Sequence, residues 1–351
     1  MSGEPLPWHD GLWRQLQQRQ AAGRLPHALL LTGPAGLGKG IFARRLAQGL
    51  LCESPDAQGN ACSHCRACHL FQAGSHPDYT VICPEEEHKG IENNSPKKKS
   101  SVIKIDQIRD FCIFLGYTSQ YGGYKIVLLE PADRLHINAA NSLLKTLEEP
   151  PVNSLLLLVT AQPARLPATV RSRCQVIRFK PPSPKVAVPW LASRLSGKLE
   201  PAALLNVASG APLAALAYAS EARWHRRQEL MGSYEQVIVG QIDPIQAAET
   251  WVQGDLAENL RWLISWHIDL IRLKMSPDST HLNNPDLRPV LRDWMAQQSP
   301  LRLFERLDAA IHLHALCMLT QTNTQLLLEV FFSGSPANDE SNIFVNKRIQ
   351  G

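Results

Sequence analysis

The chain has no membrane-length apolar run, and its first residues do not predict an export signal. Nothing in its 351 residues approaches the roughly 18 consecutive apolar residues that a membrane-spanning helix needs. The first residues, MSGEPLPWHDGLW, carry acids and prolines where a signal peptide has a basic start and an apolar run. The net charge of +4 is small, so it permits contact with nucleic acid without indicating it. We therefore expect a soluble, cytoplasmic protein that contacts no membrane, in which 44% hydrophobic residues build two or three domains.

A hydroxyl is missing from an otherwise regular phosphate-binding loop. Residues 33–40, GPAGLGKG, have the Gly-x-x-x-x-Gly-Lys spacing, but Gly40 stands where Ser or Thr would help to hold Mg²⁺. A short apolar run precedes the loop and a helical pattern follows it, which is the context that this motif requires. Backbone N–H groups of the glycines and the lysine ammonium would contact phosphate. These residues are Gly33, Gly36, Gly38 and Lys39.

An acidic pair is missing as well. ATPases with such a loop end a buried strand with Asp-Glu, of which Asp assists Mg²⁺ and Glu polarises the attacking water. Here the run KIVLL at 125–129 ends in Glu130-Pro131, and Pro131 has no acid–base chemistry. Because both the hydroxyl and the second carboxylate are absent, we do not expect this chain to hydrolyse ATP. Binding of ATP and Mg²⁺ stays open, as does the alternative that the loop only turns a strand into a helix.

Apolar runs alternate with helical patterns in the first half of the chain. The expected buried strands are 27–32, 79–83, 125–129 and 155–160, and the expected helices include about 105–116 and 138–149. This alternation predicts an α/β domain with a parallel sheet.

The pattern changes at 179–189, FKPPSPKVAVP, where four prolines mark a linker. Beyond it the sequence indicates helices alone, for example at 255–273 and at 299–319, where Ser299 caps and Pro300 takes the first helical position. We predict domains at 1–181, 182–223 and 224–332, a disordered tail at 333–351, and an exposed polar loop at 85–101.

Half of the eight cysteines fall within residues 52–68. Disulfides are not expected in a reducing cytoplasm, so a tight cluster favours a metal. The four thiolates match the number that tetrahedral Zn²⁺ requires, and with no open ligand position the site would be structural. An Fe–S cluster and incidental core thiols are the alternatives. The expected zinc ligands are Cys52, Cys62, Cys65 and Cys68.

Four motifs together resemble the clamp-loader subunits of bacterial DNA polymerase III. In chain order they are GRLPHALLLTGPAGLGKG, GSHPDY, NAANSLLKTLEEPP and TVRSRC, and the resemblance covers residues 8–180 strongly. It implies an AAA+-like α/β parallel-sheet P-loop domain with a zinc insertion, followed by a small helical lid and an all-α collar domain for oligomerisation.

The family contains an ATPase subunit and a near relative that does not hydrolyse ATP. This chain is similar to the second, because it departs from the ATPase pattern at Gly40 and at Glu130-Pro131. A third departure is Leu213 in GAPL, where the ATPase subunit carries a nucleotide-sensing Arg.

The resemblance also implies roles in a hetero-oligomeric ring. Arg173 in RSRC matches an arginine finger that acts in trans on the ATP of a neighbouring subunit, and Thr160 matches a polar residue that faces the phosphate. The implied partners are gamma/tau ATPase subunits, the delta subunit, the sliding clamp and primed DNA.

Two other hypotheses stay open. An active, gamma/tau-like ATPase would show hydrolysis by the pure chain. A stand-alone zinc-containing nucleic-acid-binding protein would bind DNA tightly, with a strong dependence on salt.

Overall fold

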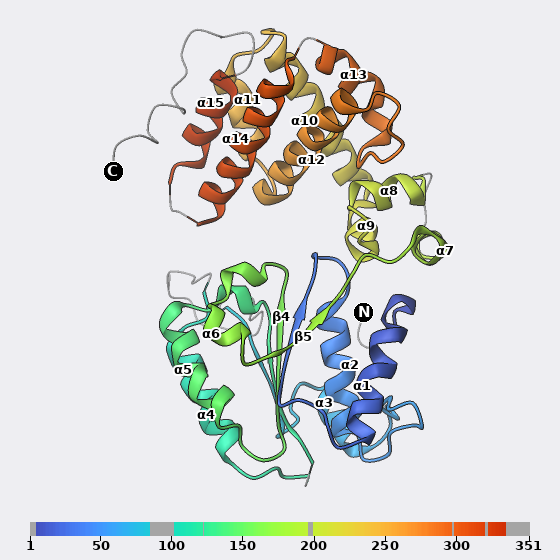
Figure 1. The fold of residues 1–351 in the computed structure, drawn as a ribbon, viewed down its shortest axis with the longest axis vertical. Coiled ribbons are helices and arrows are strands. Elements are labelled where there is room, and N and C mark those ends of the chain that lie inside the picture. Colours follow the sequence, from blue (N-terminus) through green and yellow to red (C-terminus); the bar gives the residue numbers. More distant parts are fainter. Residues whose placement is uncertain are drawn as a thin grey trace. The chain divides into compact units, whose positions relative to one another are not determined.

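The computed structural model describes residues 5–84, 102–121, 123–195, 199–296, 298–319 and 322–334 (Figure 1). The chain divides into two compact units, Met1–Ala187 and Val188–Gly351. The polar loop predicted at 85–101 and nearly all of the predicted tail lie outside the described residues. The further division of the helical half at residue 223 stays a prediction.

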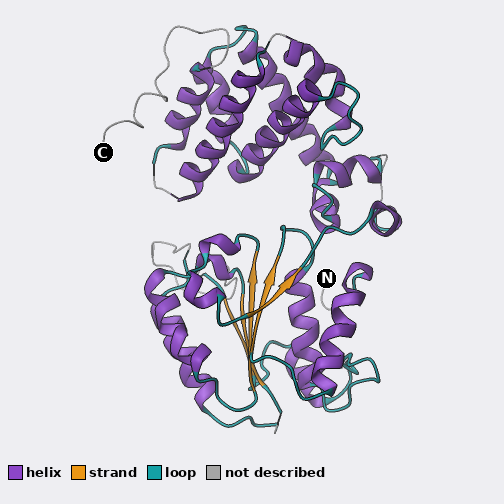
Figure 2. Ribbon diagram, in the orientation of Figure 1, coloured by secondary structure: helices purple, strands orange, loops and turns teal. Residues whose placement is uncertain are grey.

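A parallel sheet of five strands forms the centre of the first unit (Figure 2). The strands are β1 (Ala28–Thr32), β2 (Tyr79–Ile82), β3 (Lys125–Leu129), β4 (Ser154–Thr160) and β5 (Gln175–Arg178). Their order is β2-β3-β4-β1-β5, which places Thr32 beside Thr160 where two neighbouring strands end. The four predicted strands are confirmed. The sequence does not predict β5, because only Ile177 in QVIR is buried at this edge of the sheet.

Helices cover both faces of this sheet (Figure 1). One face carries α1 (Asp10–Ala21), α2 (Lys39–Leu51) and α3 (Arg66–Gln72); the other carries α4 (Ile105–Gly116), α5 (Ile137–Glu148) and α6 (Ala168–Arg171). Short 3-10 turns are η1 (Pro7–His9), η3 (Ala132–Arg134) and η4 (Pro163–Arg165). The helices predicted at 105–116 and 138–149 are therefore confirmed, as is the α/β parallel-sheet P-loop fold.

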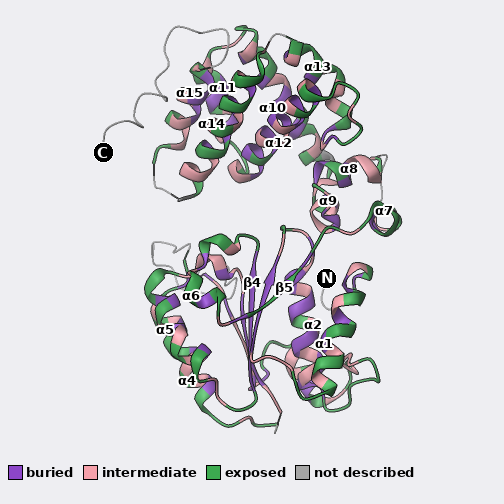
Figure 3. Ribbon diagram, in the orientation of Figure 1, coloured by how far each residue is buried: buried purple, intermediate pink, exposed green. Residues whose placement is uncertain are grey.

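Burial explains why the sequence predicts this sheet well. Every residue of β1, β3 and β4 is buried (Figure 3). Alternate side chains, such as Leu30 and Leu158, join a cluster with Phe111 of α4 and Leu143 of α5. Burial of each such side chain contributes about 1.5–3 kcal/mol. Because both faces of these strands are covered, nearly every residue in them is apolar, and the sequence shows a continuous apolar run.

The regular elements described in the second unit are helical. They are α8 (Pro201–Val207), α9 (Pro212–Tyr218), α10 (Glu221–Ile238), α11 (Pro244–Val252), α12 (Leu256–Met275), η5 (Pro285–Leu287), α13 (Arg288–Ala296), α14 (Pro300–Leu319) and α15 (Thr324–Ser333). Helix α7 (Pro184–Ala192) begins inside the proline-rich window and spans the boundary of the units. Ser299 Oγ accepts from Arg302 N at 3.2 Å, which confirms the predicted cap of α14.

Four buried tryptophans dominate the core of this unit: Trp251, Trp262, Trp266 and Trp294. In the part of the chain that is described, no single helix has the length and apolar content of a membrane span; only the pair α8 and α9, bent by 108°, reaches that content together.

Candidate functional site

The predicted phosphate loop lies between β1 and α2, as the motif requires. Gly38 precedes the helix with φ at +81°, a conformation that a residue with a Cβ rarely adopts. The Nζ of Lys39 donates to the carbonyl oxygens of Gly33 and Pro34, each at 2.7 Å. The loop thus binds its own lysine, and the ammonium group that would reach a phosphate is buried within it.

Gly40 lies directly against the carboxylate of Glu130. A Cβ built on Gly40 would lie 2.0 Å from Glu130 Oε1, far inside van der Waals contact. The second carboxylate oxygen, Oε2, lies 2.6 Å from a guanidinium nitrogen of Arg44, one turn further along α2. The missing Cβ at position 40 therefore makes room for an ion pair between the end of β3 and helix α2.

Thr160 contacts a carboxylate that sequence reasoning missed. Its Oγ1 donates to Asp133 Oδ1 at 2.5 Å and accepts from Gln162 N at 2.9 Å. Burial lowers the pKa of Lys39, while the charges of Glu130 and Asp133 oppose that shift. Asp133 follows β3 closely, and the carboxyl ends of parallel strands meet at one edge, which is the signal that could have identified it.

Two side chains from the segment before α1 contact the backbone of the phosphate loop. Trp8 Nε1 donates to Leu37 O at 2.9 Å, and His9 Nε2 lies 2.8 Å from the same oxygen. Burial lowers the pKa of His9 to about 4, so the neutral ring donates through Nε2. The His9 ring also packs edge-on against Phe42 and Phe179, with ring centroids 5.3 Å apart in both pairs. Two side chains of the preceding segment thus bind one carbonyl of the loop.

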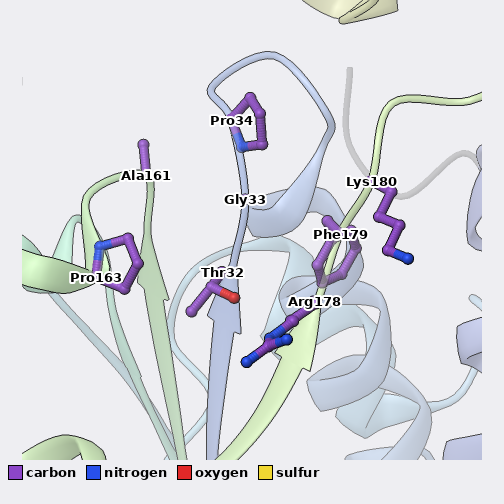
Figure 4. Close-up of a pocket in the computed structure, with 8 residues that line it drawn as sticks. All are labelled: Thr32, Gly33, Pro34, Ala161, Pro163, Arg178, Phe179 and Lys180. Carbon is purple, nitrogen blue, oxygen red and sulfur yellow. The ribbon is translucent and has the colours of Figure 1, made fainter.

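A hollow of about 320 Å³ adjoins the start of the loop (Figure 4). One wall comes from the end of β4 and the other from the end of β5. The lining residues are Thr32, Gly33, Pro34, Ala161, Pro163, Arg178, Phe179 and Lys180. The hollow therefore includes Gly33 of the predicted phosphate-binding residues, while Lys39 is not among the residues that line it.

Arg173 lies between α6 and β5 in the chain and contacts the end of α5. Its NH2 is 2.6 Å from Glu148 Oε1, and its NH1 donates to Thr169 O at 3.0 Å. The pair is solvent-exposed, with 35% of the Arg173 side chain and 51% of the Glu148 side chain accessible. Its contribution to folding is therefore about 0–1 kcal/mol, so stability alone does not explain the pair.

The four clustered cysteines converge where α2 ends and α3 begins. Their Sγ atoms all lie within 4.8 Å of one another, with Cys52–Cys62 at 3.5 Å and Cys52–Cys65 at 3.9 Å. Four thiolates about 2.3 Å from a tetrahedral zinc would be separated by about 3.8 Å. The cluster, completed by Cys68, therefore fits a four-coordinate metal ion.

Comparisons with known proteins decide the family. A model described as DNA polymerase III, delta subunit, matches residues 8–183, and a model of that subunit's C terminus matches residues 221–332. The DNA polymerase III subunit delta' of Pseudomonas aeruginosa is 37% identical over 311 residues, covering 83% of this chain and 89% of that protein. This chain belongs to the delta-prime family. The delta' subunit of Escherichia coli is 33% identical and covers 92% of both chains.

Two solved structures show a weak similarity to this chain. A gamma subunit-related protein of DNA polymerase III from Thermotoga maritima covers 91% of this chain and 97% of its own, with 17% identity and a TM-score of 0.43. The Holliday junction branch migration motor RuvB from the same organism covers 77% of this chain and 75% of its own, with 16% identity and a TM-score of 0.37.

The structure brings some of the residues singled out from the sequence close together, but not all of them. Lys39, Glu130, Asp133 and Thr160 lie at one edge of the sheet, through the contacts and charges described above. Leu213 lies in α9 of the second unit, so its relation to the loop stays a prediction.

Proposed function

We propose that this delta-prime family member is a non-hydrolysing subunit of the DNA polymerase III clamp loader in the cytoplasm. It would assemble with gamma/tau ATPase subunits and the delta subunit, and support the ATP-driven placement of the sliding clamp on primed DNA. The observation that carries this proposal is the contact between Gly40 and Glu130. A carboxylate lies against the position from which a phosphate loop normally offers its Mg²⁺-binding hydroxyl.

Two features of the loop support the absence of hydrolysis. Lys39 would have to leave the carbonyls of Gly33 and Pro34 before it could reach a phosphate. Glu130, the remaining acid at the end of β3, pairs with Arg44, and Pro131 cannot polarise water. The residues Gly33, Gly36, Gly38 and Lys39 would still bind a nucleotide if the loop opened, but Gly40 would offer no Mg²⁺-binding hydroxyl and Pro131 no carboxylate for the attacking water.

The purified chain should hydrolyse no ATP with Mg²⁺, and Gly40→Ser should not create this activity. The new side chain would displace Glu130 from Arg44, so the first unit should lose about 1–3 kcal/mol of stability. Thermal unfolding and phosphate release measure the two effects.

Gly11 offers a matched control for that substitution. It is the second residue of α1, as Gly40 is of α2, and a Cβ there meets nothing within 4 Å. Gly11→Ser should leave the melting temperature nearly unchanged. Turnover by the unmodified chain that disappears in Lys39→Ala would contradict the proposal and indicate an active ATPase.

We propose zinc as the ion held by Cys52, Cys62, Cys65 and Cys68, in a structural role. Four cysteine ligands fill a tetrahedral shell and leave no position for substrate or water. The bound ion would stabilise the connection between α2 and α3 and would take no part in catalysis.

We also propose that residues 224–332 form the collar through which the ring assembles, with 182–223 as the lid. Helix α14 supports this role, because its inner side is buried while its outer side exposes apolar residues. At about 100° per residue these side chains fall on one side of the helix. They are Leu301, Phe304, Ile311 and Met318.

Phe304→Glu should weaken assembly with gamma/tau and delta without unfolding the chain. Loss of a buried aromatic anchor costs about 2 kcal/mol, or about 30-fold in affinity. Val239→Glu, at another exposed apolar residue, which follows α10, is the control. Gel filtration of the mixed subunits with quantitative pull-down measures both; equal assembly of the two variants would exclude this surface from the collar.

A further inference from the structure

The guanidinium of Arg173 is held at two of its nitrogen atoms. NH2 meets Glu148 Oε1 at 2.6 Å, and NH1 meets the carbonyl of Thr169 at 3.0 Å. Two contacts on different nitrogens fix both the position and the plane of the group. Because a guanidinium has five N–H donors, three others stay available for a further acceptor such as a phosphate oxygen.

Local helix stability does not explain why a carboxylate stands at position 148. Glu148 is the last residue of α5 and Glu149 follows it, so two acids meet the negative end of the helix dipole. An exposed ion pair adds little to folding, so it offsets this disadvantage only weakly. The position of Glu148 is well defined nevertheless, because Leu143 and Leu147 anchor α5 in the core.

We propose that Glu148 is a positioning residue for Arg173, and this inference rests on the proposed clamp-loader function and on the arginine-finger role that the family resemblance implies for Arg173. Glu148 holds the side chain in one orientation before the neighbouring subunit presents its ATP. A long arginine side chain would otherwise sample many rotamers, and the entropy of ordering it would add to the barrier of the reaction. The motif NSLLKTLEEPP thus supplies the carboxylate that orients the arginine of the motif RSRC.

The test uses a clamp loader assembled from the full chain, gamma/tau and delta, with single-turnover ATP hydrolysis as the readout, because total turnover of a ring with several active sites would fall only by the share of one site. Glu148→Ala should lower the single-turnover rate constant about 2- to 13-fold, the effect of releasing one rotamer-rich side chain, and change the Kd for ATP less than about twofold. Glu148→Gln retains an acceptor oxygen and should fall between Ala and the unmodified chain. Glu149→Gln, at the adjacent carboxylate, should leave turnover unchanged.

A double-mutant cycle separates positioning from a general structural role. In the Arg173→Ala background, Glu148→Ala should cause no further loss, because the side chain that it positions is gone. A normal rate for Glu148→Ala beside a strongly reduced rate for Arg173→Ala overturns this inference alone. A normal rate for Arg173→Ala overturns the arginine finger and the inference with it, and an equal loss from Glu148→Ala in both backgrounds overturns the positioning role.

Discussion

Arg173→Ala should nearly abolish ATP turnover at the one site that this chain completes in an assembled clamp loader. Arginine fingers contribute about 10³–10⁵-fold to kcat, because a fixed positive charge meets the charge that develops on the transferred phosphoryl group. Arg173 is partly exposed, and its partners among the described residues are the exposed Glu148 and the carbonyl of Thr169, so its positive charge can meet that phosphoryl group without leaving a buried partner unpaired. The isolated chain, which we expect to have no turnover, should be unaffected.

The measurement needs a readout confined to that site. Total turnover of a ring with several active sites would fall only by the share of one site, so single-turnover kinetics with limiting ATP are the sharper choice. Arg173→Lys keeps the charge but loses the planar fork, and should recover part of the rate. Arg171→Ala removes the same charge two residues earlier, at the end of α6, and should be close to normal. Equal rates for Arg171→Ala and Arg173→Ala would argue against a finger.

The sequence predicts the centre of the fold because burial there is two-sided. Runs such as LLLLVT and KIVLL are buried along their whole length, so their apolar character reports their place in the sheet directly. The edge strand β5 gives no such signal, because three of its four residues are exposed. The residues of the phosphate loop and of the cysteine cluster are each close together in the sequence, so their spacing is enough to predict both sites.

Other contacts at the site join residues that are far apart in the sequence, and no pattern in the sequence predicts them. Glu130 and Arg44 pair across the end of the sheet, and His9 reaches the carbonyl of Leu37 from the segment before α1. Glu148 and Arg173 stand in two separate motifs, and only the packing of α5 against α6 brings them together. Sequence reasoning identifies that Gly40 lacks a hydroxyl, but only the structure shows which carboxylate uses the space.

Removal of the metal should destabilise the first unit and leave the chemistry of Arg173 intact. The link between α2 and α3 has little core of its own: Cys52, Ala67 and Cys68 are its buried apolar residues from 52 to 68 among those described. Free zinc at 100 times its Kd would contribute about 2.7 kcal/mol, and for a unit of this size that corresponds to roughly 5–11 °C in Tm. A chelator or Cys65→Ser should lower Tm by this amount.

The control variant and a second readout distinguish a structural ion from a catalytic one. Cys112→Ser changes a half-buried thiol outside the cluster, which contacts Thr146 Oγ1 at 3.2 Å, and should retain about one zinc per chain by mass spectrometry. Below its lowered Tm, Cys65→Ser should still support partner turnover through Arg173, because no ligand position is open to substrate. A chelated chain that keeps its Tm would remove the stabilising role. Loss of turnover at a temperature where the variant is folded would instead indicate that the ion takes part in turnover by the ring, since α2 begins at Lys39 and Cys52 directly follows its last residue.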